Sequence, residues 1–216
     1  MYAVSSLFIK SSQTVLDMLS LLESGSLVPT LVLWRIIYEN YIISRYLLDN
    51  TDDMSERFND HWLITENRIR KGGNEAIASK IASLIEKYGP RYQDNYGWAG
   101  SKKNEKGRFN SFAAIHNQMK SKEFFEMYSF TSDIIHSSSY SVNRSIFSDG
   151  RYGNTDMIGT FFDDFRLPIE WTLQVMEKFV GIILEYFYFE DPYEKKSLCQ
   201  IIEVLSLSII AESGRK

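Results

Sequence analysis

The sequence predicts an all-α fold, a single-domain multi-helix bundle of about six or seven helices with two long polar loops. Apolar residues recur at helical spacing along most of the 216-residue chain, and no segment shows the alternation that is typical of half-buried strands. Glycine and proline mark the ends of the apolar runs. Because 44% of the residues are hydrophobic, the chain can bury one substantial core but is short for two ordinary domains. We therefore expect one helical domain over residues 1–216.

The first half of the sequence predicts four helices with clear end signals. Their expected ranges are about 3–23, 29–48, 53–70 and 74–88. Asp52 or Asp53 can cap the third helix, and Gly89 with Pro90 ends the fourth. Apolar residues cover almost the whole circumference of the second helix, so we expect it to be the most buried one.

Polar stretches alternate with helices in the second half. The helical pattern lapses over 89–110, which is long for a loop without a special role and is a candidate lid or binding loop. A second polar stretch covers about 137–156. The helices expected here lie at about 111–119, 121–136, 157–189 and 192–211, and Pro168 is suited to the start of the main part of the third of these.

Composition narrows the class of protein. The single cysteine, Cys199, lies in an apolar helical run, which excludes a disulfide framework and favours a reducing, cytoplasmic location. Charged or amide residues interrupt the longest apolar runs, so we expect neither a membrane span nor a secretory segment. Glycine-rich phosphate loops, HExxH and GxSxG motifs and paired cysteines are missing from the sequence. We expect no metal and no cofactor.

The charge of the chain is unevenly distributed. Twelve Lys and Arg stand against four Asp and Glu between Arg68 and Lys122, an excess of about eight positive charges in a chain whose net charge is -4. A basic segment of this kind attracts phosphate or acidic partners, and Lys102 and Lys103 are its candidate ligand-binding residues. The alternative interpretation is an ordinary solvated face.

Two polar pairs stand in apolar helices. Arg35 and Glu39 share one face of the second predicted helix, and Ser132 and His136 share one face of the helix over about 121–136. Buried charge is costly unless it is paired, so we expect the two faces to meet in one polar cluster. The cluster is either a buried network that fixes the register of the helices or a functional site.

The three histidines differ in their surroundings. His136 can act as a general acid or base near neutral pH, with Glu39 setting its tautomer and Arg35 holding a phosphate or carboxylate. His61 follows Arg57 by four residues, and we expect it at the surface or at the boundary of the core. His116 can approach the same cleft from the short predicted helix.

Three segments resemble a family of uncharacterised bacterial helical proteins, domain-of-unknown-function family 5677. They are LWRIIYENYIISRYLLDN, YGWAG and YSFTSDIIHSSS, in that order, and the resemblance covers roughly residues 28–145. The resemblance implies no reaction, but it implies that Trp98 and its loop close over the cleft. The residues that it singles out are Arg35, Glu39, Trp98, Tyr128, Ser132 and His136.

A looser resemblance links the chain to HEPN proteins, the helical nucleases of bacterial defence and toxin systems. Their motif is an arginine, four to six residues, and a histidine. Only three residues separate Arg57 from His61, and no arginine precedes His136 at the motif distance, so Arg35 from another helix would have to supply the cation. The resemblance implies metal-independent cleavage of RNA in phage defence.

Two functions are therefore expected alternatives. The first is a helical module of the defence or toxin type, expected to be a homodimer, that binds a phosphate-bearing ligand, a nucleic acid or a protein partner at a cleft. The expected lining of this cleft is Arg35, Glu39, Ser132 and His136. The second is a HEPN-like ribonuclease with His136, Arg35 and Glu39 as catalytic residues. The candidate ligand-binding residues are Ser132, Trp98, Tyr128, Lys102 and Lys103.

Overall fold

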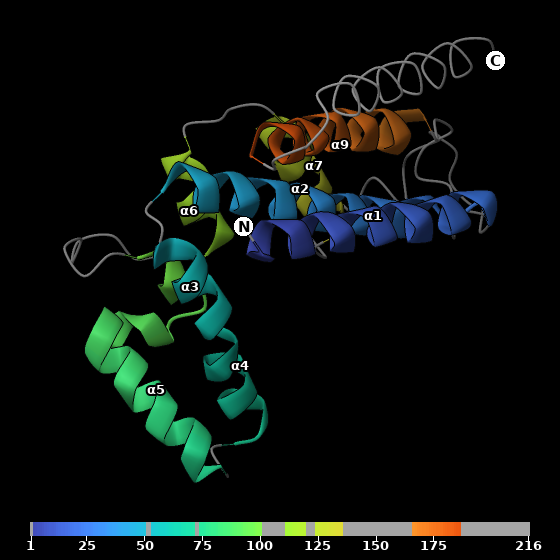
Figure 1. Cartoon of the computed structure of the whole chain (residues 1–216). Helices are drawn as coiled ribbons and strands as arrows, with labels where there is room; N and C mark the ends of the chain where they lie inside the picture. The colour runs from blue at the N-terminus through green and yellow to red at the C-terminus, as the bar shows by residue number, and fades with distance from the viewer. Residues whose placement is uncertain are drawn as a thin grey trace. The chain divides into compact units, whose positions relative to one another are not determined.

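Every regular element in the described part of the chain is a helix (Figure 1), which confirms the all-α prediction. The computed structural model describes residues 2–50, 53–71, 74–100, 111–119, 124–135 and 166–186. The α-helices are α1 (Tyr2–Glu23), α2 (Leu27–Asp49), α3 (Asp53–Asp60), α4 (Trp62–Ile69), α5 (Glu75–Tyr88), α6 (Phe112–Gln118), α7 (Phe125–Ile135) and α9 (Arg166–Tyr186). Two short 3₁₀ helices, η1 (Pro90–Gln93) and η2 (Gly97–Ala99), lie in the stretch that was expected to be a loop.

Most helix boundaries agree with the sequence signals. The bounds of α1, α2, α5 and α6 lie within about two residues of the predicted ones. Helix α7 begins at Phe125 instead of about residue 121, because Phe124 has a left-handed backbone with φ of 59°. Helix α9 lies within the predicted range 157–189, and Pro168 is in its first turn. The helix predicted over 192–211 lies outside the described residues.

One predicted helix, over about 53–70, is divided in the structure. The prediction of a continuous helix is wrong, because α3 ends before His61 and α4 begins after it. The Arg57 carbonyl accepts a hydrogen bond from the Tyr92 hydroxyl at 2.7 Å in addition to the His61 amide at 3.1 Å. The Ile64 amide then bonds the His61 carbonyl, three residues back, at 3.0 Å. A tertiary contact thus accompanies a tight turn between two short helices.

The chain divides into two compact units. The first consists of Met1–Val4 and Ile42–Ser121, and the second of Ser5–Tyr41 and Lys122–Lys216. Helices α1 and α2 each contribute residues to both units. The single domain expected over the whole chain stays a prediction.

The second unit includes α7, α9 and most of α1 and α2 (Figure 1). Ring contacts between these four helices form an aromatic core. The ring of Trp34 stacks on Tyr38 with centroids 5.4 Å apart and is tilted against Trp171 at 5.6 Å. Phe8 of α1 meets Phe179 of α9 edge-on at 5.3 Å. Helix α2 supplies more of the large, fully buried side chains than any other described helix, as predicted.

The first unit is built around Trp98. This side chain is 3% exposed, and its ring lies edge-on against Phe58 at 4.8 Å and Tyr46 at 5.8 Å. The Tyr46 hydroxyl donates a hydrogen bond to the Ala99 carbonyl at 2.6 Å. Burial raises the pKa of Tyr46, and the nearby Arg57 lowers it in part. The YGWAG segment therefore packs as part of the core of this unit.

Arg57 is a buried cation in the first unit. It is 5% exposed, its guanidinium carbon lies 4.7 Å above the Tyr88 ring, and Nη2 donates to the Gly97 carbonyl at 3.4 Å. No carboxylate of the described residues lies within ion-pair distance of it. Aromatic and carbonyl contacts hold this charge in place of a salt bridge.

His61 is also buried, so the expectation that it lies at the surface or boundary is wrong. Its Nε2 lies 2.9 Å from the Asp94 carbonyl oxygen, and its ring packs edge-on against Tyr92 at 5.2 Å. Burial lowers the pKa of His61, the backbone contacts raise it in part, and the positive charge of Arg68 lowers it further.

We expect the free energy of unfolding to decrease as the pH falls from about 7 to about 5. The folded pKa of His61 lies below the ordinary value, so the unfolded chain binds more protons in this range. The contribution of neutral His61 to stability is fully present above the pKa that this histidine has in the unfolded chain. It is lost as the pH falls below that value. Urea unfolding of wild type and His61→Gln measures the effect, and the decrease should be shallower in the variant. His116, whose pKa burial also lowers, acts in the same direction in both proteins. Equal decreases in both would contradict the prediction.

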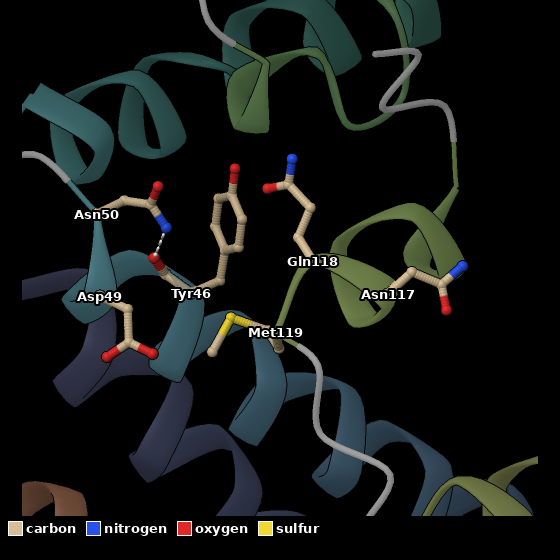
Figure 2. Close-up of a pocket in the computed structure, with 6 residues that line it drawn as sticks. All are labelled: Tyr46, Asp49, Asn50, Asn117, Gln118 and Met119. Atoms are coloured by element: carbon tan, nitrogen blue, oxygen red, sulfur yellow. Dashed lines mark hydrogen bonds between the residues drawn. The ribbon is translucent and has the colours of Figure 1, made fainter.

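A pocket of about 440 Å³ opens in the first unit where α2 and α6 end (Figure 2). Its lining residues are Tyr46, Asp49, Asn50, Asn117, Gln118 and Met119. The Asn50 side-chain amide donates a hydrogen bond to the Tyr46 carbonyl at 2.7 Å, which holds it at the end of α2. This pocket could not be predicted from the sequence, because amides that follow a helix usually act as caps or are solvated.

Candidate functional site

The predicted pair of Arg35 and Glu39 forms on α2, in the second unit. One turn of helix separates the two residues, so their side chains lie on the same face. Arg35 Nη2 lies 3.4 Å from Glu39 Oε1, and the two side chains are 17% and 29% exposed. This is longer than the usual 2.7–2.9 Å of a charge-assisted hydrogen bond. The pair is therefore loose and partly accessible to solvent.

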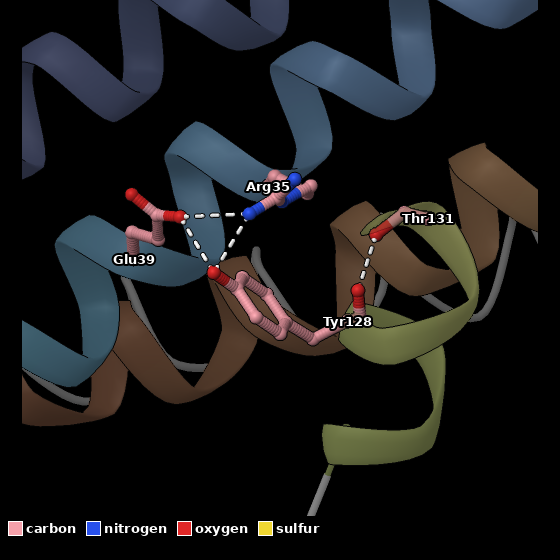
Figure 3. A network of polar contacts seen from close by, with 4 residues as sticks. All are labelled: Arg35, Glu39, Tyr128 and Thr131. Atoms are coloured by element: carbon pink, nitrogen blue, oxygen red, sulfur yellow. Dashed lines mark hydrogen bonds and ion pairs between the residues drawn. The ribbon is translucent and has the colours of Figure 1, made fainter. Parts of the chain in front are cut away.

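Tyr128 of α7 joins this pair (Figure 3). Its hydroxyl accepts a hydrogen bond from Arg35 Nη2 at 2.7 Å and donates one to Glu39 Oε1 at 3.0 Å. The guanidinium carbon of Arg35 lies 4.5 Å from the centre of the Tyr128 ring. We call Arg35, Glu39 and Tyr128 the Arg35 cluster.

The Tyr128 hydroxyl keeps its proton at neutral pH. Burial raises the pKa of Tyr128 to about 12, the negative charge of Glu39 adds to this effect, and Arg35 opposes it. A protonated hydroxyl can accept from the guanidinium and donate to the carboxylate at the same time. Tyr128 thus orders both charged groups without adding a charge.

The guanidinium of Arg35 is only partly used by the described residues. Both of its hydrogen bonds come from one nitrogen, Nη2. The buried Nε has no hydrogen-bond partner in the described part of the chain. Arginine presents donors in a rigid planar fork that matches carboxylate and phosphate oxygens. Because Nε is closed to solvent, the donor that the described residues leave for an anion is Nη1.

The other predicted residues of the cleft have different positions. Ser132 lies in α7, one turn after Tyr128, and no hydrogen bond joins it to Arg35 or Glu39 among the described residues. The neighbouring Thr131 hydroxyl donates to the Tyr128 carbonyl at 2.9 Å (Figure 3). His136, Lys102 and Lys103 lie outside the described residues.

The family model of a family of unknown function, DUF5677, matches residues 1–154. The chain belongs to the DUF5677 family. No curated protein and no solved structure gives a significant match.

In this DUF5677 chain the Arg35 cluster combines residues from two of the family-like segments. Arg35 and Glu39 come from the first segment and Tyr128 from the third, and the structure brings them together. Trp98, from the YGWAG segment, belongs to the other unit, where Tyr46 and Phe58 pack against it. That Trp98 closes over the cleft stays a prediction.

Two general features of the described helices bear on the kind of site. None of them is long and apolar enough to cross a membrane. Across the described ranges, no group of three or more His, Cys, Asp or Glu side chains is placed to hold a metal ion. The described groups of the Arg35 cluster are a guanidinium, a carboxylate and a phenol.

Proposed function

We propose that this DUF5677 chain binds a phosphate-bearing ligand, with the guanidinium of Arg35 as the group that holds the phosphate. The observation that carries the proposal is the loose contact of Arg35 with a single oxygen of Glu39. Arginine–carboxylate pairs frequently form two short parallel hydrogen bonds. Here Glu39 and Tyr128 both meet Nη2, Nε is buried, and Nη1 has no hydrogen bond to a described residue and is left for an anion.

The arrangement favours binding because the arginine is ordered before a ligand arrives. Immobilising a flexible side chain on binding costs about 0.5–1.5 kcal/mol. The Tyr128 ring, 4.5 Å from the guanidinium carbon, and the hydroxyl at 2.7 Å already restrict Arg35. Glu39 contributes to the same restriction, but its negative charge repels an anion.

The basic segment, which belongs to the first unit up to Ser121, is a separate reason to choose a polymer of phosphates as the probe. In its described part, Lys71, Lys80 and Arg91 are exposed and form no ion pair with a described residue. Exposed cations of this kind bind successive phosphates of a nucleic acid and make the affinity dependent on salt. RNA is therefore the probe of choice.

We expect Arg35→Met to weaken RNA binding at least tenfold. A hydrogen bond between charged groups contributes about 1.5–3 kcal/mol, and a tenfold change corresponds to about 1.4 kcal/mol. Fluorescence anisotropy of a labelled single-stranded RNA at low salt measures the affinity. Circular dichroism verifies that the variant is folded.

Two further variants separate a binding site from a structural network. Arg45→Met is the matched control, because Arg45 lies on the same helix, pairs with Asp49 at 3.7 Å and is 36% exposed. It should bind RNA as wild type does. Glu39→Gln should bind as well as wild type or better, because it removes a negative charge. If Arg35→Met and Arg45→Met bind RNA equally well, Arg35 is not the phosphate-binding group.

A second candidate function is the HEPN-like ribonuclease, in which His136 acts as acid or base and Arg35 stabilises the charged phosphate. It is supported by the contact of Tyr128 with Arg35, since α7 directly precedes His136 in the sequence. The test is to incubate RNA with each protein in the presence of EDTA and to measure the length of the products. This alternative is supported if wild type shortens the RNA and His136→Ala leaves it intact. The expected homodimer, protein partner, defence role and cytoplasmic location stay predictions.

A further inference from the structure

The pocket where α2 and α6 end differs in chemistry from the Arg35 cluster. Its volume, about 440 Å³, lies within the range of small-molecule sites. Three amides, one carboxylate, one thioether and one phenol belong to its lining residues, and none of these residues is a Lys, Arg or His. Among the residues that the structure describes, the lining is therefore polar and includes no cationic side chain.

The charge of this pocket disfavours an anion. Asp49 is the one charged side chain among the described lining residues, and its ion-pair partner in the same ranges, Arg45, is 3.7 Å away and half-exposed. The C-terminal end of α2, a helix of 23 residues, adds partial negative charge from its last carbonyls. A ligand that donates hydrogen bonds is favoured, and a phosphate is not.

The amide side chains determine which hydrogen-bond donors and acceptors the pocket offers to a ligand. The Asn50 side chain donates one N–H to the Tyr46 carbonyl. This hydrogen bond holds the side-chain oxygen in place as an acceptor. The Gln118 side chain has no hydrogen bond to another described residue, and its amide points toward the Tyr46 ring (Figure 2). The Met119 thioether points toward Asp49 and offers a polarizable surface for a flat ring.

We propose that this pocket binds a nucleobase with an exocyclic amino group, as adenine and cytosine have. An amide side chain offers a donor and an acceptor that match adjacent groups on the edge of such a base, and a carboxylate accepts from its amino group. Gln118 supplies the amide, Asp49 the carboxylate and Met119 the surface for the ring. Uracil presents a carbonyl where cytosine has the amino group, so it leaves Asp49 without a donor.

Calorimetric titration of the full chain with adenosine, cytidine and uridine tests the proposal. We expect adenosine and cytidine to bind at least tenfold more tightly than uridine. Gln118→Ala should weaken adenosine binding about tenfold, and Asn59→Ala, an exposed amide of α3 outside the pocket, should leave it unchanged. Asp49→Asn should reduce the preference for cytidine over uridine.

Several results would overturn the proposal. The proposal is wrong if no nucleoside binds, if uridine and cytidine bind with equal affinity, or if Gln118→Ala leaves adenosine binding unchanged. It is also wrong if spermidine binds more tightly than the nucleosides and Asp49→Asn abolishes that binding, because this result would indicate a cation site. The base could come from a free nucleoside or from a nucleic-acid strand, and a titration with labelled oligoadenylate distinguishes these two sources. Gln118→Ala weakens adenosine alone if the ligand is a free nucleoside, and oligoadenylate as well if it is a base within a strand. Arg35→Met should not change adenosine binding, so this test is independent of the proposed phosphate site.

Discussion

Replacing Trp34 with alanine is expected to lower the free energy of unfolding by about 3–5 kcal/mol. Trp34 is 0% exposed, and it stacks on Tyr38 at 5.4 Å and packs against Trp171 at 5.6 Å. The substitution leaves a cavity between α2 and α9 and removes two aromatic contacts. Because native domains are stable by only about 5–15 kcal/mol, a large part of the stability would be lost. Urea unfolding followed by circular dichroism measures it.

Trp34→Phe is the matched control for the cavity. The indole N–H of Trp34 is buried and has no hydrogen-bond partner in the part of the chain described. Phenylalanine retains an aromatic ring and removes this unsatisfied donor, whose burial is itself unfavourable. We expect a clearly smaller loss of stability than for alanine. Equal losses in the two variants would show that the ring contacts do not stabilise the core.

Gly97→Ala is expected to cost about 3 kcal/mol, the upper part of the usual range for an overpacked site. A Cβ atom at residue 97 would lie 2.3 Å from the Arg91 carbonyl oxygen and 2.5 Å from that of Tyr92. Both atoms are backbone atoms of η1, so no side-chain rotation relieves the clash. Either η1 and η2 separate, or Trp98 moves out of its place in the core. Urea unfolding of the variant measures the loss.

Gly181→Ala makes the same change of side chain, but we expect it to raise the stability instead of lowering it. Gly181 lies in α9, and apart from its chain neighbours and local helix backbone no atom of the described residues lies within 4 Å of the position of an added Cβ. Alanine there should raise stability by about 0.5–1 kcal/mol, since it restricts the unfolded chain and favours a helix. If Gly97→Ala proved as stable as wild type, the close approach of η1 and η2 would be wrong.

Helices with local signals could be predicted from the sequence. Asn74 caps α5 by accepting hydrogen bonds from the Ala76 and Ile77 amides at 3.0 and 3.2 Å, and both donors are neighbours in the sequence. The break at His61 could not be predicted in this way. It accompanies a hydrogen bond from the Tyr92 hydroxyl to the Arg57 carbonyl, 35 residues away in the sequence.

In the candidate site too, a local contact could be predicted from the sequence and a tertiary contact could not. The pairing of Arg35 and Glu39 follows from their spacing on one helix, and the structure contains it. The sequence periodicity of α7 favoured Ser132 as their partner, but the side chain that reaches them is Tyr128. Helical periodicity gives the direction of a side chain but not its reach or the rotation of one helix against another, and a tyrosine is much longer than a serine. Only the family resemblance pointed to Tyr128.

The aromatic core of the second unit has a consequence for the chain as it leaves the ribosome. Thr172 of α9 touches the Met18 sulfur of α1 at 3.7 Å across 154 residues of sequence. Synthesis adds about 5–20 residues per second, so on the order of ten seconds pass before α9 follows α1. Until then the faces of α1 and α2 that carry Phe8 and Trp34 lack their α9 partners. A nascent or truncated chain without α9 is thus expected to depend on chaperones and to aggregate.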